Sequence, residues 1–147
     1  INVNSENEKN NFNKNELNTA IKNFLKKIKA LDKEVIVIKS TPEMGWEIPT
    51  FLAKKILRTD QVDRKFLSVN KDLFLERNIN FNKFLDNIKD NLQLYIYNPE
   101  KLFCDNSICY AHEKNYPLFY DDDHLSSLGA KKMSKDLIKF MNNKNLF

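Results

Sequence analysis

The run of residues 35–38 limits the folds open to this chain more than any other stretch. Its four residues, Val35-Ile36-Val37-Ile38, are all β-branched and show no alternation of apolar with polar side chains. Such a run is typical of a strand buried on both faces, as in a parallel sheet covered by helices. Residues 92–97, stopped by Asn98-Pro99, predict a second strand. Because helical patterns stand between these strands, the sequence indicates an α/β fold with helices around at least two parallel strands.

Four segments have apolar residues at helical spacing, and we expect a helix in each. They are residues 16–31, 50–57, 71–91 and 126–141, with the third open to a break at 78–80. In the first segment we expect the apolar stripe to face the core. The stripe consists of Leu17, Ala20, Ile21, Phe24, Leu25, Ile28 and Leu31.

The ends of the chain and its length define the domain organisation. Residues 1–15 are rich in Asn, Glu and Lys, so we expect a flexible surface loop or frayed segment there. The full 147 residues are long enough for one hydrophobic core but not for two. We therefore assign residues 16–147 to part of a single α/β domain, and we expect the chain to be a piece of a longer protein.

Glycine content and charge exclude several functional classes. The chain has only two glycines, Gly45 and Gly129. They cannot build the nucleophile elbow, the dinucleotide fingerprint or the P-loop, which need glycine where the backbone turns sharply or approaches a ligand. The 24 basic and 20 acidic residues leave a net charge of +4, and the lysines are scattered. We interpret them as solvated helix faces and expect no nucleic-acid partner.

The sequence Tyr120-Asp121-Asp122-Asp123-His124-Leu125-Ser126 holds the strongest catalytic candidates. A carboxylate three residues before a histidine can fold back onto the imidazole if the residues between them form a turn, and Asp favours turns. An imidazole whose Nδ1–H is held by a carboxylate is an effective general base. Asp121 and His124 are the candidate pair, with Ser126 or Ser127 as cap of the next helix. A solvated acidic turn with a surface histidine remains the alternative.

Two further features are open to more than one interpretation. The loop of residues 40–49 follows a predicted strand, where α/β folds line their ligand crevices, so Glu43 and Trp46 are candidate cleft-lining residues. Alternatively, Pro42 only turns the chain and Trp46 packs against it. Cys104 and Cys109 fit a short disulfide loop in an oxidising compartment, two buried thiols, or part of a metal cluster with His112. Zinc requires a fuller ligand set, so we expect no metal and no cofactor.

Several motifs taken in order resemble the SGNH (GDSL-type) hydrolases, and most closely the SGNH domains fused to acyltransferase-3 membrane proteins. The resemblance covers roughly residues 17–141. It rests on Glu34-Val35-Ile36-Val37-Ile38, Thr41-Pro42-Glu43-Met44-Gly45, Ile48-Pro49, Leu102-Phe103-Cys104, Cys109, Pro117-Leu118-Phe119-Tyr120-Asp121, His124-Leu125-Ser126 and Gly129-Ala130. It implies a three-layer α/β/α fold with a parallel sheet, the SGNH or flavodoxin-like arrangement, whose N-terminal strands are missing from this chain.

The resemblance also implies a function. Asp121 and His124 would serve a catalytic serine, and Cys104 and Cys109 would form a disulfide, which places the domain on the periplasmic or extracytoplasmic face of the membrane. The family's Gly-Asp-Ser-type motif does not occur here. The four serines considered, none in a matching context, are Ser40, Ser107, Ser126 and Ser127. We therefore expect the nucleophile upstream of this chain, which would be inactive alone.

The expected partners and the rival functions follow from the same resemblance. The intact protein would transfer an acyl group from an acyl donor to a glycan acceptor of the cell envelope, as an O-acyltransferase or esterase. An acyltransferase-3 membrane domain would lie in the same full-length chain and anchor it. The alternatives are a free-standing esterase or lipase and a non-catalytic SGNH-like binding module.

Overall fold

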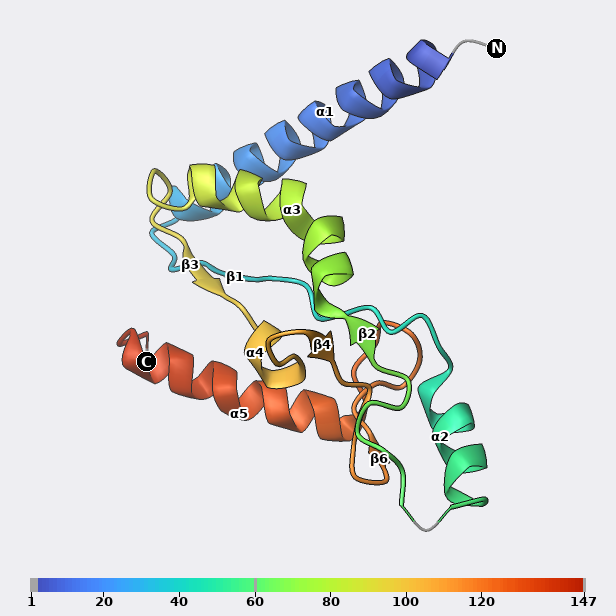
Figure 1. Ribbon diagram of the computed structural model, residues 1–147. Helices are drawn as coiled ribbons and strands as arrows, with labels where there is room; N and C mark the ends of the chain where they lie inside the picture. Colours follow the sequence, from blue (N-terminus) through green and yellow to red (C-terminus); the bar gives the residue numbers. More distant parts are fainter. Residues whose placement is uncertain (1–2, 60, 147) are drawn as a thin grey trace. The chain divides into compact units, whose positions relative to one another are not determined.

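The computed structural model describes the backbone of residues 3–59 and 61–146 and, within those ranges, side chains from residue 14 onwards (Figure 1). The chain divides into two compact units. One comprises Ile1–Val37 with Phe81–Ile96, and the other comprises Ile38–Asn80 with Tyr97–Phe147. The second unit contains the candidate catalytic residues.

The first unit is built on helix α1 (Val3–Lys29) and the C-terminal part of helix α3 (Lys71–Ile88). Its buried centre consists of Leu25, Leu85 and Ile88. Around it pack the half-buried apolar residues Ile21, Val35, Val37, Phe81, Phe84, Leu92 and Leu94. Helix α3 runs without a break through 78–80. Asn78 lies within it, and its side-chain amide donates to the carbonyl of Phe74, 2.9 Å away.

Helix α1 differs from its prediction at both its start and its buried face. It begins at Val3 and not at Glu16, so the loop expected over residues 1–15 is wrong from Val3 onward. Once a helix has nucleated, each added residue costs little, which lets it extend through a polar sequence. Among the apolar residues expected to face the core, Leu17, Phe24 and Leu31 are exposed, at 59%, 62% and 68%. Leu17 and Phe24 lie on one line of the helix, about 80° and 100° from the buried Leu25, and Leu31 lies beyond the end of the helix.

Strands β1 (Ile36–Ile38) and β3 (Tyr95–Tyr97) form a two-stranded sheet. The amide of Tyr95 donates to the carbonyl of Val35 at 3.0 Å, and the amide of Lys39 donates to the carbonyl of Tyr97 at 2.9 Å. The partners advance in the same direction along both strands, so the pair is parallel. Together with the helices, this pair confirms the α/β class, while the three-layer arrangement stays a prediction.

Burial on both faces of the first strand was predicted and is wrong in the structure. Residues 35–37 are half-buried, and Ile38 is 43% exposed. The reason is that, among the residues that the structure describes, β3 is the single strand beside β1 in its sheet. An apolar run buried on both faces needs strands on each side and helices over each face.

The second unit contains the remaining elements. Helices α2 (Ile48–Ile56), α4 (Glu100–Phe103) and α5 (Ser127–Asn143) lie in it with the N-terminal part of α3. Strand β2 (Val69–Asn70) pairs antiparallel with β4 (Ile108–Cys109), and β5 (His112–Glu113) pairs antiparallel with β6 (Tyr116–Pro117). The stretch of residues 108–117 therefore carries three short strands. Strand β4 depends on a partner far away in the chain, whereas β5 and β6 pair with each other across residues 114–115.

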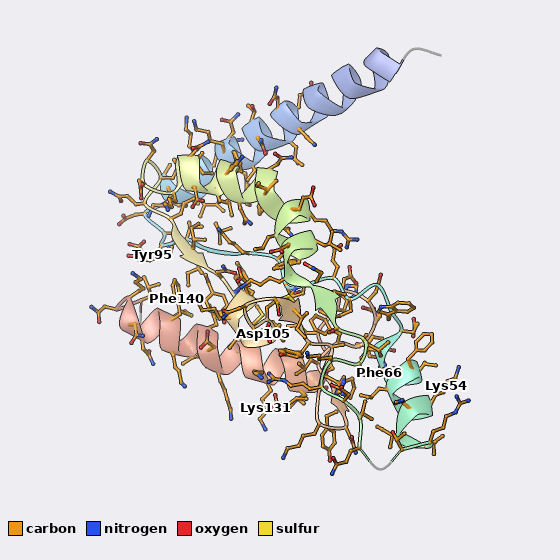
Figure 2. All side chains as sticks on the ribbon, viewed as in Figure 1. Lys54, Phe66, Tyr95, Asp105, Lys131 and Phe140 are labelled. Atoms are coloured by element: carbon orange, nitrogen blue, oxygen red, sulfur yellow. A yellow bond between two sulfur atoms is a disulfide. The ribbon has the colours of Figure 1, made fainter. Side chains whose placement is uncertain are left out.

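A hydrophobic core holds the second unit together and lies directly under the candidate site. Its buried members are Met44, Ile48, Phe74, Phe103, Cys109, Ala111, Leu118 and Phe119. Helix α5 is fastened to strand β3 beside this core. The Tyr97 ring lies 5.4 Å from that of Phe140, and its hydroxyl donates to Asp136 Oδ2 at 2.9 Å. Figure 2 shows Phe140 on α5. Among the described residues, no helix has the length and apolar character needed to cross a membrane.

Candidate active site

Residues 119–125 form a closed loop, called the site loop below, between strand β6 and helix α5. Phe119 and Leu125 pair across its base as an antiparallel bridge. The amide of Tyr120 donates to the carbonyl of His124 at 2.7 Å, and the amide of Ser126 donates to the carbonyl of Leu118 at 3.0 Å. The loop therefore leaves the core and returns to it within a few residues, which fixes its two ends.

The start of helix α5 is held against the same point. The Ser126 hydroxyl donates to the carbonyl of Pro117 at 2.7 Å and accepts from the amide of Gly129 at 3.2 Å, so Ser126 is the helix cap. A Cβ placed on Gly129 would lie 2.1 Å from the carbonyl oxygen of Leu118. Only glycine permits this approach between helix and strand. The site loop is therefore positioned by contacts on both of its sides.

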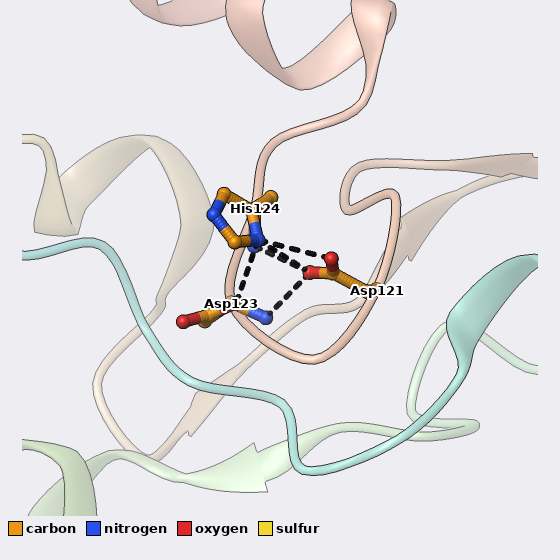
Figure 3. Close-up of side chains that lie close together, drawn as sticks. All are labelled: Asp121, Asp123 and His124. Atoms are coloured by element: carbon orange, nitrogen blue, oxygen red, sulfur yellow. Dashed lines mark hydrogen bonds and ion pairs between the residues drawn. The ribbon is translucent and has the colours of Figure 1, made fainter.

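Within the loop, Asp121 holds His124 through several hydrogen bonds (Figure 3). Asp121 Oδ1 accepts from the amides of Asp123 at 3.1 Å and His124 at 2.7 Å. His124 Nδ1 lies 2.9 Å from Asp121 Oδ2 and 3.1 Å from Oδ1. Nδ1 therefore carries the hydrogen that faces the carboxylate. The side chain of His124 is 76% exposed, and Nε2 lies on the side of the ring away from the carboxylate.

These contacts set the charge states of the pair. Hydrogen bonds from the amides of His124 and Asp123 lower the pKa of Asp121 to about 2. The hydrogen bond to Asp121, followed by the negative charges of Asp121 and Asp123, raises the pKa of His124 above its ordinary value. The carboxylate is therefore ionised throughout the working pH range, and the imidazolium that forms during proton transfer is stabilised.

Asp123 also belongs to this cluster, although the sequence reasoning did not select it. Its Oδ1 lies 2.9 Å from His124 Nδ1. The only sequence signal was its place in a run of three acidic residues. Asp121, Asp123 and His124 each offer one atom of a kind that binds metals, a carboxylate oxygen or an imidazole nitrogen. These three atoms lie within 4.8 Å of one another. However, a ring nitrogen that donates its hydrogen to a carboxylate has no lone pair for a cation, so the geometry is that of a carboxylate–imidazole cluster.

The loop containing Glu43 and Trp46 is tied to the site loop through the backbone. The amide of Met44 donates to the carbonyl of Asp122 at 2.5 Å. Glu43 forms an ion pair with Arg77 at 3.1 Å. Both contribute to a cavity of about 100 Å³ lined by Glu43, Met44, Gly45, Val69, Asn70, Leu73, Phe74 and Arg77. Trp46 does not line this cavity. It is 48% exposed, with its ring edge-to-face against that of Phe51 at 5.8 Å.

The two cysteines are joined by a disulfide, with Cys109 fully buried in the core. The bridge uses both thiols, so the Cys-Cys-His metal cluster considered from the sequence is not formed. His112 is itself buried, with Nδ1 2.6 Å from the carbonyl oxygen of Lys114. The disulfide fastens α4 to β4, next to the strands that lead into the site loop.

The α/β scaffold and the exposed carboxylate–imidazole pair define a domain suited to proton transfer at a serine or water. The comparison with protein families names it: residues 2–139 match the model of the SGNH domain fused to AT3 domains, so the chain belongs to this family. No curated protein and no solved structure matched the chain. Membership assigns the chain to the SGNH-type domains, a class of acyl hydrolases and acyltransferases.

Proposed function

We propose that this chain is the C-terminal part of an SGNH domain that transfers or hydrolyses an acyl group, most simply an acetyl ester on a cell-envelope polysaccharide. The observation that carries the proposal is the Asp121–His124 pair. Asp121 occupies Nδ1 of the imidazole and leaves Nε2 exposed to a substrate or a nucleophile. This is the arrangement that a general base requires.

The reaction would proceed in two half-reactions, with a serine supplied by a segment outside these 147 residues. His124 Nε2 removes the proton from the serine hydroxyl as the oxygen forms a bond to the acyl carbonyl carbon of the donor. The donor alcohol leaves with that proton, and an acyl-serine remains. His124 then deprotonates a glycan hydroxyl or water, which attacks the acyl carbon and restores the serine. Asp121 stays ionised and stabilises the imidazolium in both steps.

Glu43 and Trp46 are proposed to line the cleft for the acceptor. The support is the hydrogen bond between Met44 and Asp122, which brings their loop to the site loop. The exposed face of an indole is suited to pack against a sugar ring, and the carboxylate and guanidinium of Glu43 and Arg77 offer hydrogen bonds to hydroxyl groups.

We further propose that an acyltransferase-3 domain lies in the same full-length protein and supplies the acyl donor. The family description supports this arrangement, since it is of SGNH domains fused to such domains. The disulfide supports a location outside the cytoplasm, where thiols are oxidised. We also propose that the whole SGNH domain is a three-layer α/β/α sandwich, with further parallel strands beside β1 and β3.

The test is the His124→Ala variant of the full-length protein. The assay measures acyl-ester content of the envelope polysaccharide and, in parallel, the free acid released from an aryl acetate. We expect a loss of about 10³-fold or more, as is typical for removal of a triad histidine. Asp122→Asn is the matched control, because it changes a neighbouring site-loop residue that does not hydrogen-bond to the ring.

Three results would change the proposal. A near-wild-type rate for His124→Ala would reject the catalytic assignment. Release of free acid with no acylated glycan would make the protein an esterase. An inactive wild-type protein that still binds the polysaccharide would make it a binding module.

A further inference from the structure

A single ring nitrogen of His124 faces two carboxylates. Asp121 accepts the hydrogen bond from Nδ1, and Oδ1 of Asp123 lies 2.9 Å from the same nitrogen. Figure 3 shows the two side chains on the same edge of the ring. Nδ1 has only one hydrogen, so Asp121 is its acceptor while Asp123 acts as a second negative charge in contact.

The two carboxylates are held in different ways. Asp121 is 27% exposed and receives two backbone amide hydrogens in addition to the ring hydrogen. Asp123 is 55% exposed, and its own amide donates to Asp121. In the part of the chain that the structure describes, the carboxylate of Asp123 has no recorded interaction except that with His124. Nothing about the fold therefore requires a carboxylate at this position.

We propose that Asp123 is a second positioning carboxylate for His124, sharing with Asp121 the stabilisation of the imidazolium and able to accept the Nδ1 hydrogen when Asp121 is neutralised. This inference rests on the proposed function of His124 as the general base. A rotation of the imidazole would turn the Nδ1 hydrogen from one carboxylate to the other, since an oxygen of each lies 2.9 Å from Nδ1. Loss of Asp121 alone would then leave a ring that is still held and still basic.

The charges facing the ring make this prediction specific. The groups acting on His124 are Asp121, Asp123 and, more weakly, Asp122. The contact is exposed, so water and salt screen it, and direct contact should matter more than mere proximity. Asp122→Asn is therefore a matched control, because it removes one negative charge from the same turn without removing a contact to Nδ1.

The first experiment follows the titration of His124 by NMR in the 147-residue chain. The chain has only two histidines, so His124→Gln identifies the signal. We expect Asp123→Asn to lower the pKa of His124 more than Asp122→Asn does, and the Asp121→Asn/Asp123→Asn pair to lower it further. A high salt concentration should reduce the difference in His124 pKa between the Asp122→Asn and Asp123→Asn variants. Equal shifts for the Asp122 and Asp123 variants would overturn the proposal.

The second experiment measures kcat/KM against pH for the full-length protein. Asp123→Asn should move the acidic limb to lower pH, whereas Asp122→Asn should leave it nearly in place. The Asp121→Asn variant should keep a measurable kcat/KM. Adding Asp123→Asn to it should reduce kcat/KM by roughly a further tenfold or more. A double variant as active as Asp121→Asn would overturn the proposal.

The two proposals fail separately. If His124→Ala stays active while Asp123→Asn shifts the titration of His124, the proposed function is wrong and the two-carboxylate contact stands. If His124→Ala is inactive and Asp123→Asn behaves as Asp122→Asn, only the second carboxylate is rejected.

Discussion

Replacing Gly129 by alanine should show how closely helix α5 must approach the strand that leads to the site loop. The new Cβ would lie 2.1 Å from the Leu118 carbonyl oxygen and 3.2 Å from Leu125 Cδ2. The first distance falls short of ordinary van der Waals contact, which begins at 3.4 Å, by about 1.3 Å. The carbonyl of Leu118 cannot easily retreat, because it accepts the amide hydrogen of Ser126. The helix would have to shift away from β6.

Two opposing effects decide how much Gly129→Ala changes the free energy of unfolding. Alanine favours a helix over glycine by up to about 1 kcal/mol. Overpacking against a rigid backbone atom costs about 1–3 kcal/mol or more. We expect the clash to win, with a net loss of about 2 kcal/mol in the free energy of unfolding. Urea unfolding followed by circular dichroism measures this loss directly.

Gly45→Ala is the matched control, because it should lower the free energy of unfolding through backbone strain and not through a steric clash. No atom lies within 4 Å of the added Cβ, but the residue has a φ of +69°. Its cost should be about 1–2 kcal/mol of backbone strain. A Gly129→Ala protein as stable as wild type, or more stable, would show that helix propensity dominates. The close approach at Leu118 would then not exist in solution.

Three further predictions concern the site and the two restraints beside it. The pKa of His124 is raised, and the base must be neutral to accept a proton. We therefore expect kcat/KM of the full-length protein to fall on acidification with a midpoint above the ordinary histidine pKa of about 6.5. A midpoint below that pKa would contradict the Asp121 contact. Removing the disulfide with Cys104→Ala/Cys109→Ala should lower the free energy of unfolding by about 2 kcal/mol in urea, since the loop is short, and an unchanged midpoint would refute this estimate. Tyr97→Phe should lower the free energy of unfolding by about 1–2 kcal/mol, because the hydrogen bond to Asp136 is lost. An equal loss in an Asp136→Ala background would show that this bond contributes nothing.

Much of the secondary structure and the central pair of the site follow from local patterns. Strand β1 lies within the β-branched run, and the α2 and α5 helices lie within about two residues of their predicted ends. The Asp121–His124 contact was expected because a turn brings residues three apart together, and turn formation depends on nearby residues alone. The assignment of the pair to catalysis stays a prediction.

Other features of the site were outside the reach of sequence patterns. Asp123 was passed over because a run of acidic residues does not reveal which side chain will face the ring. The hydrogen bond from Met44 to Asp122 joins residues far apart in the chain, and no periodicity encodes it. Strand β4 likewise pairs with β2, far away in the chain, whereas β5 and β6 pair across residues 114–115, which lack the Asn-Gly or Asp-Gly turn signal.

By itself the sequence determined the α/β class, the positions of most helices and the contact between Asp121 and His124, because these depend on side-chain type and on short-range spacing. Only the tertiary structure decided which faces are buried and how the site loop is held. Leu17 and Phe24 on α1 and Leu31 beyond its end are exposed, and β1 is only partly covered. Burial depends on which elements pack together, and the approach of Gly129 to Leu118 depends on backbone positions set by the whole core.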